Sequence, residues 1–88
     1  MLRIQRTSNG QVVLTLIGRM DGENVAELNK LFLSEAKGRR IILDLKDLTL
    51  VDQEAVKYLE GREADGVQLR NCPAYIREWI TRQRLGTT

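Results

Sequence analysis

The stretch LTLVDQEAVKYL, residues 48–59, decides the fold, because two different residue patterns meet in it. Apolar residues lead up to Asp52, and helix-forming residues follow it. Asp52 can accept a hydrogen bond from the free amides at a helix start, and Glu54 would lie in the first turn, where a negative charge is favourable. The core-facing side of this predicted helix consists of three apolar residues at helical spacing: Ala55, Val56 and Leu59.

The residues before this helix predict the centre of a sheet. RIILDL, residues 40–45, is too short for an independent helix and is dense in isoleucine and leucine, which is typical of a buried strand. The following KDLTLVD, residues 46–52, is expected to be a connection. The helix would then begin at the carboxyl edge of the sheet, where α/β domains usually bind ligands and partners.

The N-terminal half predicts two strands and a helix. LRIQRT, residues 2–7, and QVVLTLIG, residues 11–18, are β-branched and apolar, and the SNG between them favours a tight antiparallel turn. Gly18 is expected to end the second strand. A helix is expected to begin between Asp21 and Asn24 and to end at Gly38.

The C-terminal half adds one strand and one more helix. The helix after Asp52 is expected to end at Gly61 or Gly66. VQLR, residues 67–70, alternates as a strand does, and residues 71–84 predict a last helix with Pro73 in its first turn. This order predicts an α/β fold, a single domain over residues 1–88 with a four-stranded mixed β-sheet and three helices on one face.

Composition narrows the function classes. The chain has 88 residues, of which 42% are hydrophobic and 30% charged, as in ordinary soluble globular domains. A formal net charge of +2 does not by itself indicate nucleic-acid binding. The single cysteine, Cys72, cannot form an intramolecular disulfide, and neither a signal peptide nor a membrane-spanning stretch is recognised. We therefore expect a cytoplasmic protein that contacts neither nucleic acid nor membrane.

The chain offers few catalytic groups. It contains no histidine, the commonest general base, and no cluster with metal-ligand spacing. Asp44 and Asp52 are expected to accept backbone hydrogen bonds rather than to form a catalytic carboxylate pair. No glycine-rich loop of the kind that cradles phosphates is present. The sequence predicts a domain without enzymatic activity, cofactor or metal.

Three segments resemble the STAS domain family, which includes bacterial anti-sigma-factor antagonists and the cytoplasmic domains of sulfate transporters. They are VVLTLIGRMDGENVAELNKLF (residues 12–32), RIILDLKDLTLVDQEAVKYLEG (residues 40–61) and GVQLRNCPAYIREWI (residues 66–80). DLKDLTLVD is the most characteristic piece. The chain is similar to a minimal version of this domain, because the longer antagonists continue beyond the last helix with further elements.

The resemblance implies a partner-binding edge whose usual switch is absent. In phosphorylatable antagonists two hydroxyl residues and a glycine follow the aspartate, and a partner kinase phosphorylates the second hydroxyl residue. Here Glu54 stands at that position and has no hydroxyl group. The partner would be an anti-sigma factor or its kinase. The resemblance places partner binding at Thr49, Asp52, Gln53, Glu54, Ala55 and Tyr58.

Several alternatives remain open at this level. Glu54 is interpreted either as a residue that favours the helix start or as a permanent stand-in for a phosphoserine, whose greater charge it matches only in part. The domain could also be a structural or oligomeric scaffold, including a homodimer, without antagonist activity. A third alternative is weak nucleotide or anion binding at the helix start.

Overall fold

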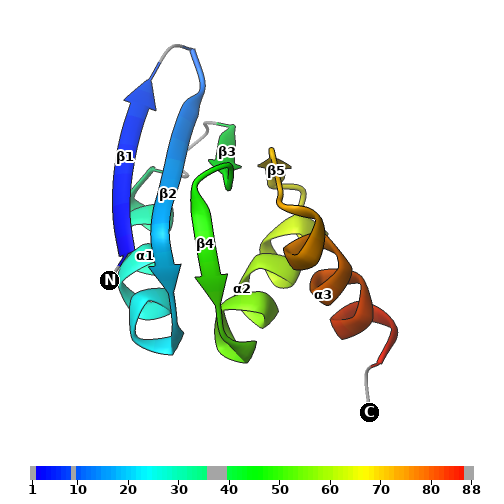
Figure 1. Ribbon diagram of the computed structural model, residues 1–88. Coiled ribbons are helices and arrows are strands. Elements are labelled where there is room, and N and C mark those ends of the chain that lie inside the picture. Colours follow the sequence, from blue (N-terminus) through cyan, green and yellow to red (C-terminus); the bar gives the residue numbers. More distant parts are fainter. Residues whose placement is uncertain (1, 9, 36–39, 87–88) are drawn as a thin grey trace.

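Five strands and three helices are formed by the residues that the computed structural model describes, namely 2–8, 10–35 and 40–86 (Figure 1). The strands are β1 (Leu2–Ser8), β2 (Val12–Met20), β3 (Ile41–Asp44), β4 (Leu48–Val51) and β5 (Gln68–Arg70). The helices are α1 (Gly22–Glu35), α2 (Gln53–Ala64) and α3 (Ala74–Leu85). The expected turn residue Asn9 and the expected helix stop Gly38 lie outside the described residues.

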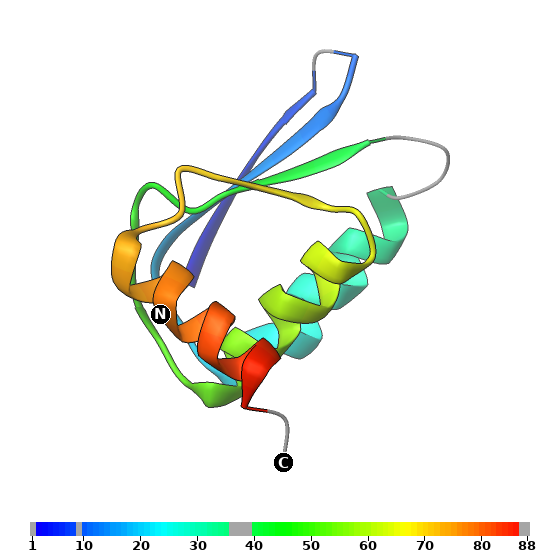
Figure 2. The ribbon, with the colours of Figure 1, turned by 90° about the vertical axis from the view of Figure 1, so that its right-hand side faces the viewer.

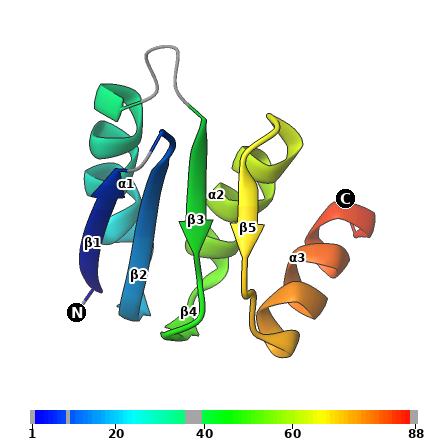
Figure 3. The same cartoon turned by 90° about the horizontal axis from the view of Figure 1, so that it is seen from above.

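The strands form one mixed sheet, which confirms the predicted α/β class. The order along the sheet is β1-β2-β3-β5; β1 is antiparallel to β2, and the other pairings are parallel. All three helices lie on one side of this sheet, and α3 packs against α2 (Figures 2 and 3). Helix α2 ends before Gly66, at which φ is 97°, whereas Gly61 lies inside the helix.

The prediction that residues 46–52 form only a connection is wrong, because β4 lies within them. β2 has nine residues and β3 only four, so β3 covers only the first part of the β2 edge, from Val12 to Thr15. β4 pairs in parallel with the remainder, from Gly18 to Met20. Pairing satisfies backbone groups that this edge would otherwise leave free, which is why the apolar connection becomes a strand.

Gly18 does not end β2, as the sequence suggested, but lies two residues inside its end. Its φ is 98°, and the register of the β2–β4 pairing shifts directly after it. The amide of Gly18 donates to the carbonyl of Asp47 at 3.0 Å, and its carbonyl accepts a 2.8 Å hydrogen bond from the Thr49 hydroxyl. Gly18 is thus the point at which the chain beside β2 changes from β3 to β4.

One hydrophobic core lies between the sheet and the helices. Alternate residues of β2 point into it, and Leu14 and Leu16 are fully buried. Helix α1 contributes Leu28 and Phe32, and α3 contributes Ile76 and Ile80, while Trp79 packs against the core from a half-buried position. Burying one large aliphatic side chain is worth about 1.5–3 kcal/mol, so this layer carries most of the stability.

The opposite face of the sheet carries no helix in the described ranges (Figures 2 and 3). The register places two rows of side chains across it. One row runs through Thr7, Val13, Ile42 and Gln68, and the next through Gln5, Thr15, Asp44 and Arg70. We call this surface the open face; Arg3 and Ile17, which are also paired across β1 and β2, belong to it.

Ion pairs hold α3 against α2. Glu63 accepts two 2.8 Å hydrogen bonds from Arg77 and one of 2.9 Å from Arg84. The hydrogen bond from Arg77 is the main reason that the pKa of Glu63 is lowered and that of Arg77 is raised. The C-terminal arginines that give this part of the sequence its basic character therefore include residues that bind helix α2.

Candidate functional site

Helix α2 begins at the carboxyl end of β4, with Asp52 as its cap. The backbone of Asp52 is extended, with φ −106° and ψ −177°, and its Oδ1 accepts a 2.9 Å hydrogen bond from the amide of Ala55. This satisfies one of the free donors that every helix start exposes. The capping role predicted for Asp52 is confirmed.

Helix α1 begins at the same end of the sheet, directly after β2. Oδ1 of Asp21 accepts hydrogen bonds from the amides of Glu23 and Asn24, at 3.1 and 3.3 Å. In return, the Asn24 side chain accepts a 3.0 Å hydrogen bond from the amide of Asp21. This reciprocal arrangement resembles a capping box and fixes the helix start within the predicted range, between Asp21 and Asn24.

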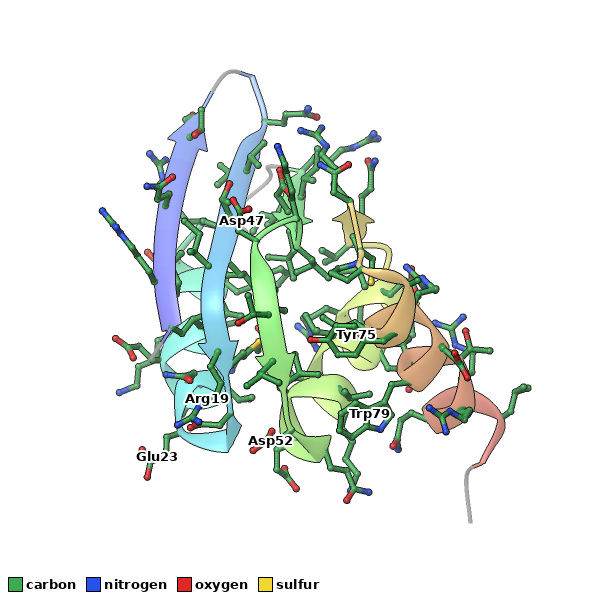
Figure 4. The ribbon with its side chains drawn as sticks, viewed as in Figure 1. Arg19, Glu23, Asp47, Asp52, Tyr75 and Trp79 are labelled. Atoms are coloured by element: carbon green, nitrogen blue, oxygen red, sulfur yellow. The ribbon has the colours of Figure 1, made fainter. Side chains whose placement is uncertain are left out.

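Asp52 also connects the two helix starts. Its second oxygen, Oδ2, accepts a 3.0 Å hydrogen bond from the amide of Gly22, the first residue of α1. A side-chain Cβ at Gly22 would lie 3.4 Å from Cβ and Cγ of Glu54, so Glu54 packs directly over this glycine. Figure 4 shows Asp52 and Glu23 at the same end of the molecule. We call this region, formed by residues 21–24 and 52–54, the helix-start edge.

The helix-start edge is acidic. Its carboxylates are Asp21, Glu23, Asp52 and Glu54, and none of them forms an ion pair with another described residue. Carboxylates are favourable at the positive end of a helix dipole, so the helix starts themselves account for this composition. An approaching phosphate would meet this negative charge. Several amides of the two helix starts already donate to carboxylates, namely those of Gly22, Glu23, Asn24 and Ala55. The geometry therefore disfavours the nucleotide or anion alternative.

A tyrosine of α3 fixes β4 beside this edge. The Tyr75 hydroxyl donates a hydrogen bond to the carbonyl of Thr49, in the middle of β4, and Figure 4 shows Tyr75 reaching from α3 toward β4. The Thr49 hydroxyl bonds to Gly18 on the other side of the strand. β4 is thus held between β2 and α3, and the position of Asp52 at its end depends on both contacts.

The residues that the resemblance singled out do not share one surface. Thr49, Gln53 and Glu54 are exposed, and Asp52 is half-buried. Ala55 is fully buried, so its side chain belongs to the core and only its amide faces the edge. Tyr58 is half-buried and turns toward α1, where its hydroxyl donates to Asn29 at 3.3 Å. Burial raises the pKa of the Tyr58 hydroxyl.

A shallow hollow beside the edge was not anticipated from the sequence. It encloses about 260 Å³ and is lined by Arg19, Met20, Asp21, Leu50, Val51 and Asp52. Leu50 is the apolar part of this surface, because 55% of its side chain is exposed. Strand periodicity alone would not have revealed this exposure, because alternation puts Leu50 on the same face as Leu48, which is buried.

The described part of the chain offers neither a metal site nor a membrane-spanning helix. No three His, Cys, Asp or Glu side chains among residues 2–8, 10–35 and 40–86 are grouped so that they could hold a metal ion. Within the same ranges, no helix has the length and apolar character needed to cross a membrane.

Comparison with known families identifies one match. The model of the STAS domain family matches residues 3–69, which covers β1 through most of β5 and includes the whole helix-start edge. No sequence among curated proteins matches the chain.

Solved structures share the fold at low sequence identity. The unphosphorylated form of the anti-sigma factor antagonist SpoIIAA is 22% identical, with a TM-score of 0.60 over 93% of this chain and 83% of that one. An uncharacterized DUF3478 protein with a SpoIIAA-like fold from Shewanella loihica PV-4 is 15% identical, with a TM-score of 0.58 over 99% and 79% of the two chains. Mglu is 19% identical, with a TM-score of 0.61 over 82% of this chain and 19% of Mglu.

Proposed function

The chain belongs to the STAS domain family, and from this premise we propose that it is a non-catalytic protein-interaction module in the cytoplasm. Residues 49–58, which include the α2 part of the helix-start edge and the adjoining residues of β4 and α2, would dock a regulatory protein such as an anti-sigma factor or its kinase. The similarity to the SpoIIAA antagonist supports this choice of partner class.

One observation carries the proposal. A single carboxylate, that of Asp52, holds the starts of α1 and α2 together and leaves the Gln53 and Glu54 side chains exposed beside them. A surface formed by two cross-linked helix starts is rigid, so little conformational entropy is lost when a partner binds. The exposed Leu50 and the hollow next to Asp52 provide apolar area within the same surface.

The phosphorylation switch of the family is proposed to be absent. The family resemblance implies that Glu54 stands where antagonists carry the phosphorylated residue. Its side chain lies over Gly22 rather than in an ion pair among the described residues. A glutamate carries one negative charge at pH 7, against about 1.5 to 2 for a phosphoserine. We therefore assign Glu54 to the helix start, where its charge favours α2, and not to a phosphate mimic.

The test is affinity capture from the native cytoplasm with three immobilised proteins: the wild type, Glu54→Ser and Glu27→Ser. Glu27 is an exposed glutamate of α1 without an ion pair among the described residues, so its variant controls for the loss of one surface carboxylate. Captured proteins are identified by mass spectrometry, and each candidate is purified and titrated against all three proteins.

We expect the wild type to bind an anti-sigma factor or a related kinase, with the affinity unchanged in both variants. Binding that is at least tenfold tighter for Glu54→Ser, equivalent to about 1.4 kcal/mol, would instead establish Glu54 as a phosphate mimic. Capture of further copies of this chain alone would contradict the regulatory function and support the scaffold alternative.

A further inference from the structure

Among the described residues, some arginines form ion pairs with the helices and others lie on the open face without one. Every arginine with an ion pair in the described ranges bonds to a carboxylate of a helix or of a helix end: Arg6, Arg62, Arg77, Arg82 and Arg84. Arg3 and Arg70 lie on the open face, and neither has an ion pair in those ranges. The arginine ion pairs of the described ranges thus all involve carboxylates of helices or helix ends, whereas Arg3 and Arg70 on the open face have none.

Asp44, a carboxylate of the open face, does not pair with the arginines of that face. Asp44 lies between Thr15 and Arg70 in the register. Its Oδ1 accepts hydrogen bonds from the amide of Lys46 at 3.0 Å and from the Asn71 side chain at 3.4 Å. It therefore holds the turn after β3 and the residue after β5, and it forms no ion pair with Arg70.

The spacing of these groups matches a helix. Arg3 stands on β1 and Arg70 on β5, at opposite margins of the sheet, with β2 and β3 between them. At about 4.8 Å per strand, the two arginine-bearing strands are about 14 Å apart. The half-buried Val13 and Ile17 of β2 lie in the interval. An α-helix with its side chains is about 10–12 Å wide and fits this interval.

From this arrangement we propose that the open face is a second docking surface, which binds an acidic amphipathic helix of another protein. The apolar stripe of that helix packs on Val13 and Ile17, and carboxylates on its two flanks meet Arg3 and Arg70. An apolar centre with arginines at its margin is the usual composition of a protein interface. This surface is on the opposite side of the sheet from the helices and does not depend on the proposed role of the helix-start edge.

Two other occupants fit the surface less well. A second copy that met this one open face to open face would bring Arg3 and Arg70 of both copies together, and like charges at an interface are repelled. A single-stranded nucleic acid binds sheets mainly through exposed aromatic side chains on which its bases stack. The described residues of the open face include no aromatic side chain.

The probe is an 18-residue synthetic helical peptide with one leucine stripe flanked by glutamates, labelled with fluorescein. A scrambled peptide of the same composition and a labelled oligothymidylate are the comparison ligands. Binding to the whole chain is measured by fluorescence anisotropy at low and at high salt, and the surface is mapped from amide chemical shifts of the ¹⁵N-labelled protein. The variants are Arg3→Glu, Arg70→Glu and the milder Arg3→Gln.

Lys30→Glu is the matched control, because Lys30 is an exposed α1 cation without an ion pair in the described ranges and its variant changes the net charge equally. We expect saturable binding, shifts confined to β1, β2, β3 and β5, and a loss of affinity of at least tenfold in each reversal of an open-face arginine. High salt should weaken binding, because it screens exposed charges. Lys30→Glu should bind as the wild type does.

The proposal is overturned by any of four results: no saturable binding of the peptide, equal binding of the scrambled peptide, shifts centred on the helix-start edge, or tighter binding of the oligothymidylate. Equal weakening by Lys30→Glu would overturn it as well, since it would show that only net charge matters. Circular dichroism of each variant establishes that its fold is retained. If the charge-reversal variant Arg3→Glu does not fold, peptide binding is measured with the milder variant Arg3→Gln instead.

Discussion

Asp52 accepts a 3.0 Å hydrogen bond from the amide of Gly22, 30 residues earlier in the chain, and thereby joins the starts of helices α1 and α2. Its other oxygen caps α2 through Ala55. One carboxylate thus serves two helices, and the helix-start edge owes its shape to this contact. The same residue is the one at which the sequence changes from strand to helix.

Replacing Asp52 should therefore cost more than the loss of an ordinary helix cap. Asp52→Ala removes both acceptors, and we expect the free energy of unfolding to fall by about 2 kcal/mol, measured by urea denaturation. Asp52→Asn keeps one oxygen acceptor and should lose about half as much. Asp47→Ala is the control, because Asp47 is an exposed aspartate outside the helix-start edge, and it should cost under about 0.5 kcal/mol. Equal losses for Asp52→Ala and Asp47→Ala would contradict the bridging role.

Replacing two of the glycines with alanine should change the stability of the protein in opposite directions. Gly18 has a φ of 98° at the register shift in β2, and Gly18→Ala should destabilise the protein by about 1–2 kcal/mol, because an L-residue is strained there. Gly61 lies inside α2 with open space where a Cβ would be, and Gly61→Ala should stabilise by about 0.5–1 kcal/mol. Thermal and urea unfolding of both variants check this. A stabilising Gly18→Ala would show that the positive φ is not required.

Removing the hydroxyl of Tyr75 should loosen β4. Tyr75→Phe loses the donor to the Thr49 carbonyl, at an expected cost of about 1 kcal/mol, and amide hydrogen exchange should accelerate in β4 and at the start of α3. Tyr58→Phe, which removes a hydroxyl bonded to Asn29, is the control and should leave exchange in β4 unchanged. Unaltered exchange in β4 of Tyr75→Phe would mean that β2 alone holds this strand.

Acidification should weaken the contact between α2 and α3. Hydrogen bonds from Arg77 hold the pKa of Glu63 below its ordinary value of 4.5. In the window between the folded and unfolded pKa values the folded protein binds fewer protons, so this contribution is present above the unfolded pKa and is lost as the pH falls through the folded pKa.

The measurement is urea unfolding of the wild type and Glu63→Gln at pH 7 and at pH 3. At pH 7 the variant should be less stable by about 1 kcal/mol, and at pH 3 this difference should shrink. Glu27→Gln, which alters a carboxylate without an ion pair among the described residues, should show no such change with pH. A difference for Glu63→Gln that stays constant with pH would exclude this linkage.

Local patterns in the sequence were sufficient to predict most elements of the fold. Helical spacing located α1, α2 and α3, and the capping residues Asp21 and Asp52 marked two helix starts correctly. The residues that make up each signal lie within a few positions of one another. Each signal therefore depends on the backbone of one segment and not on contacts with distant parts of the chain. The family resemblance of the segment around Asp52 was likewise contained in the sequence and is confirmed by the family match.

The tertiary structure decided what depends on residues far apart in the chain. β4 is a strand because β2 leaves part of its edge unpaired, and Gly18 lies inside β2 for the same reason. The bond from Gly22 to Asp52 and the division of the arginines between the two sides of the sheet also arise only when the chain has folded. Such contacts depend on sheet register and layer packing, and no local periodicity specifies the partner of a strand edge or of a side chain.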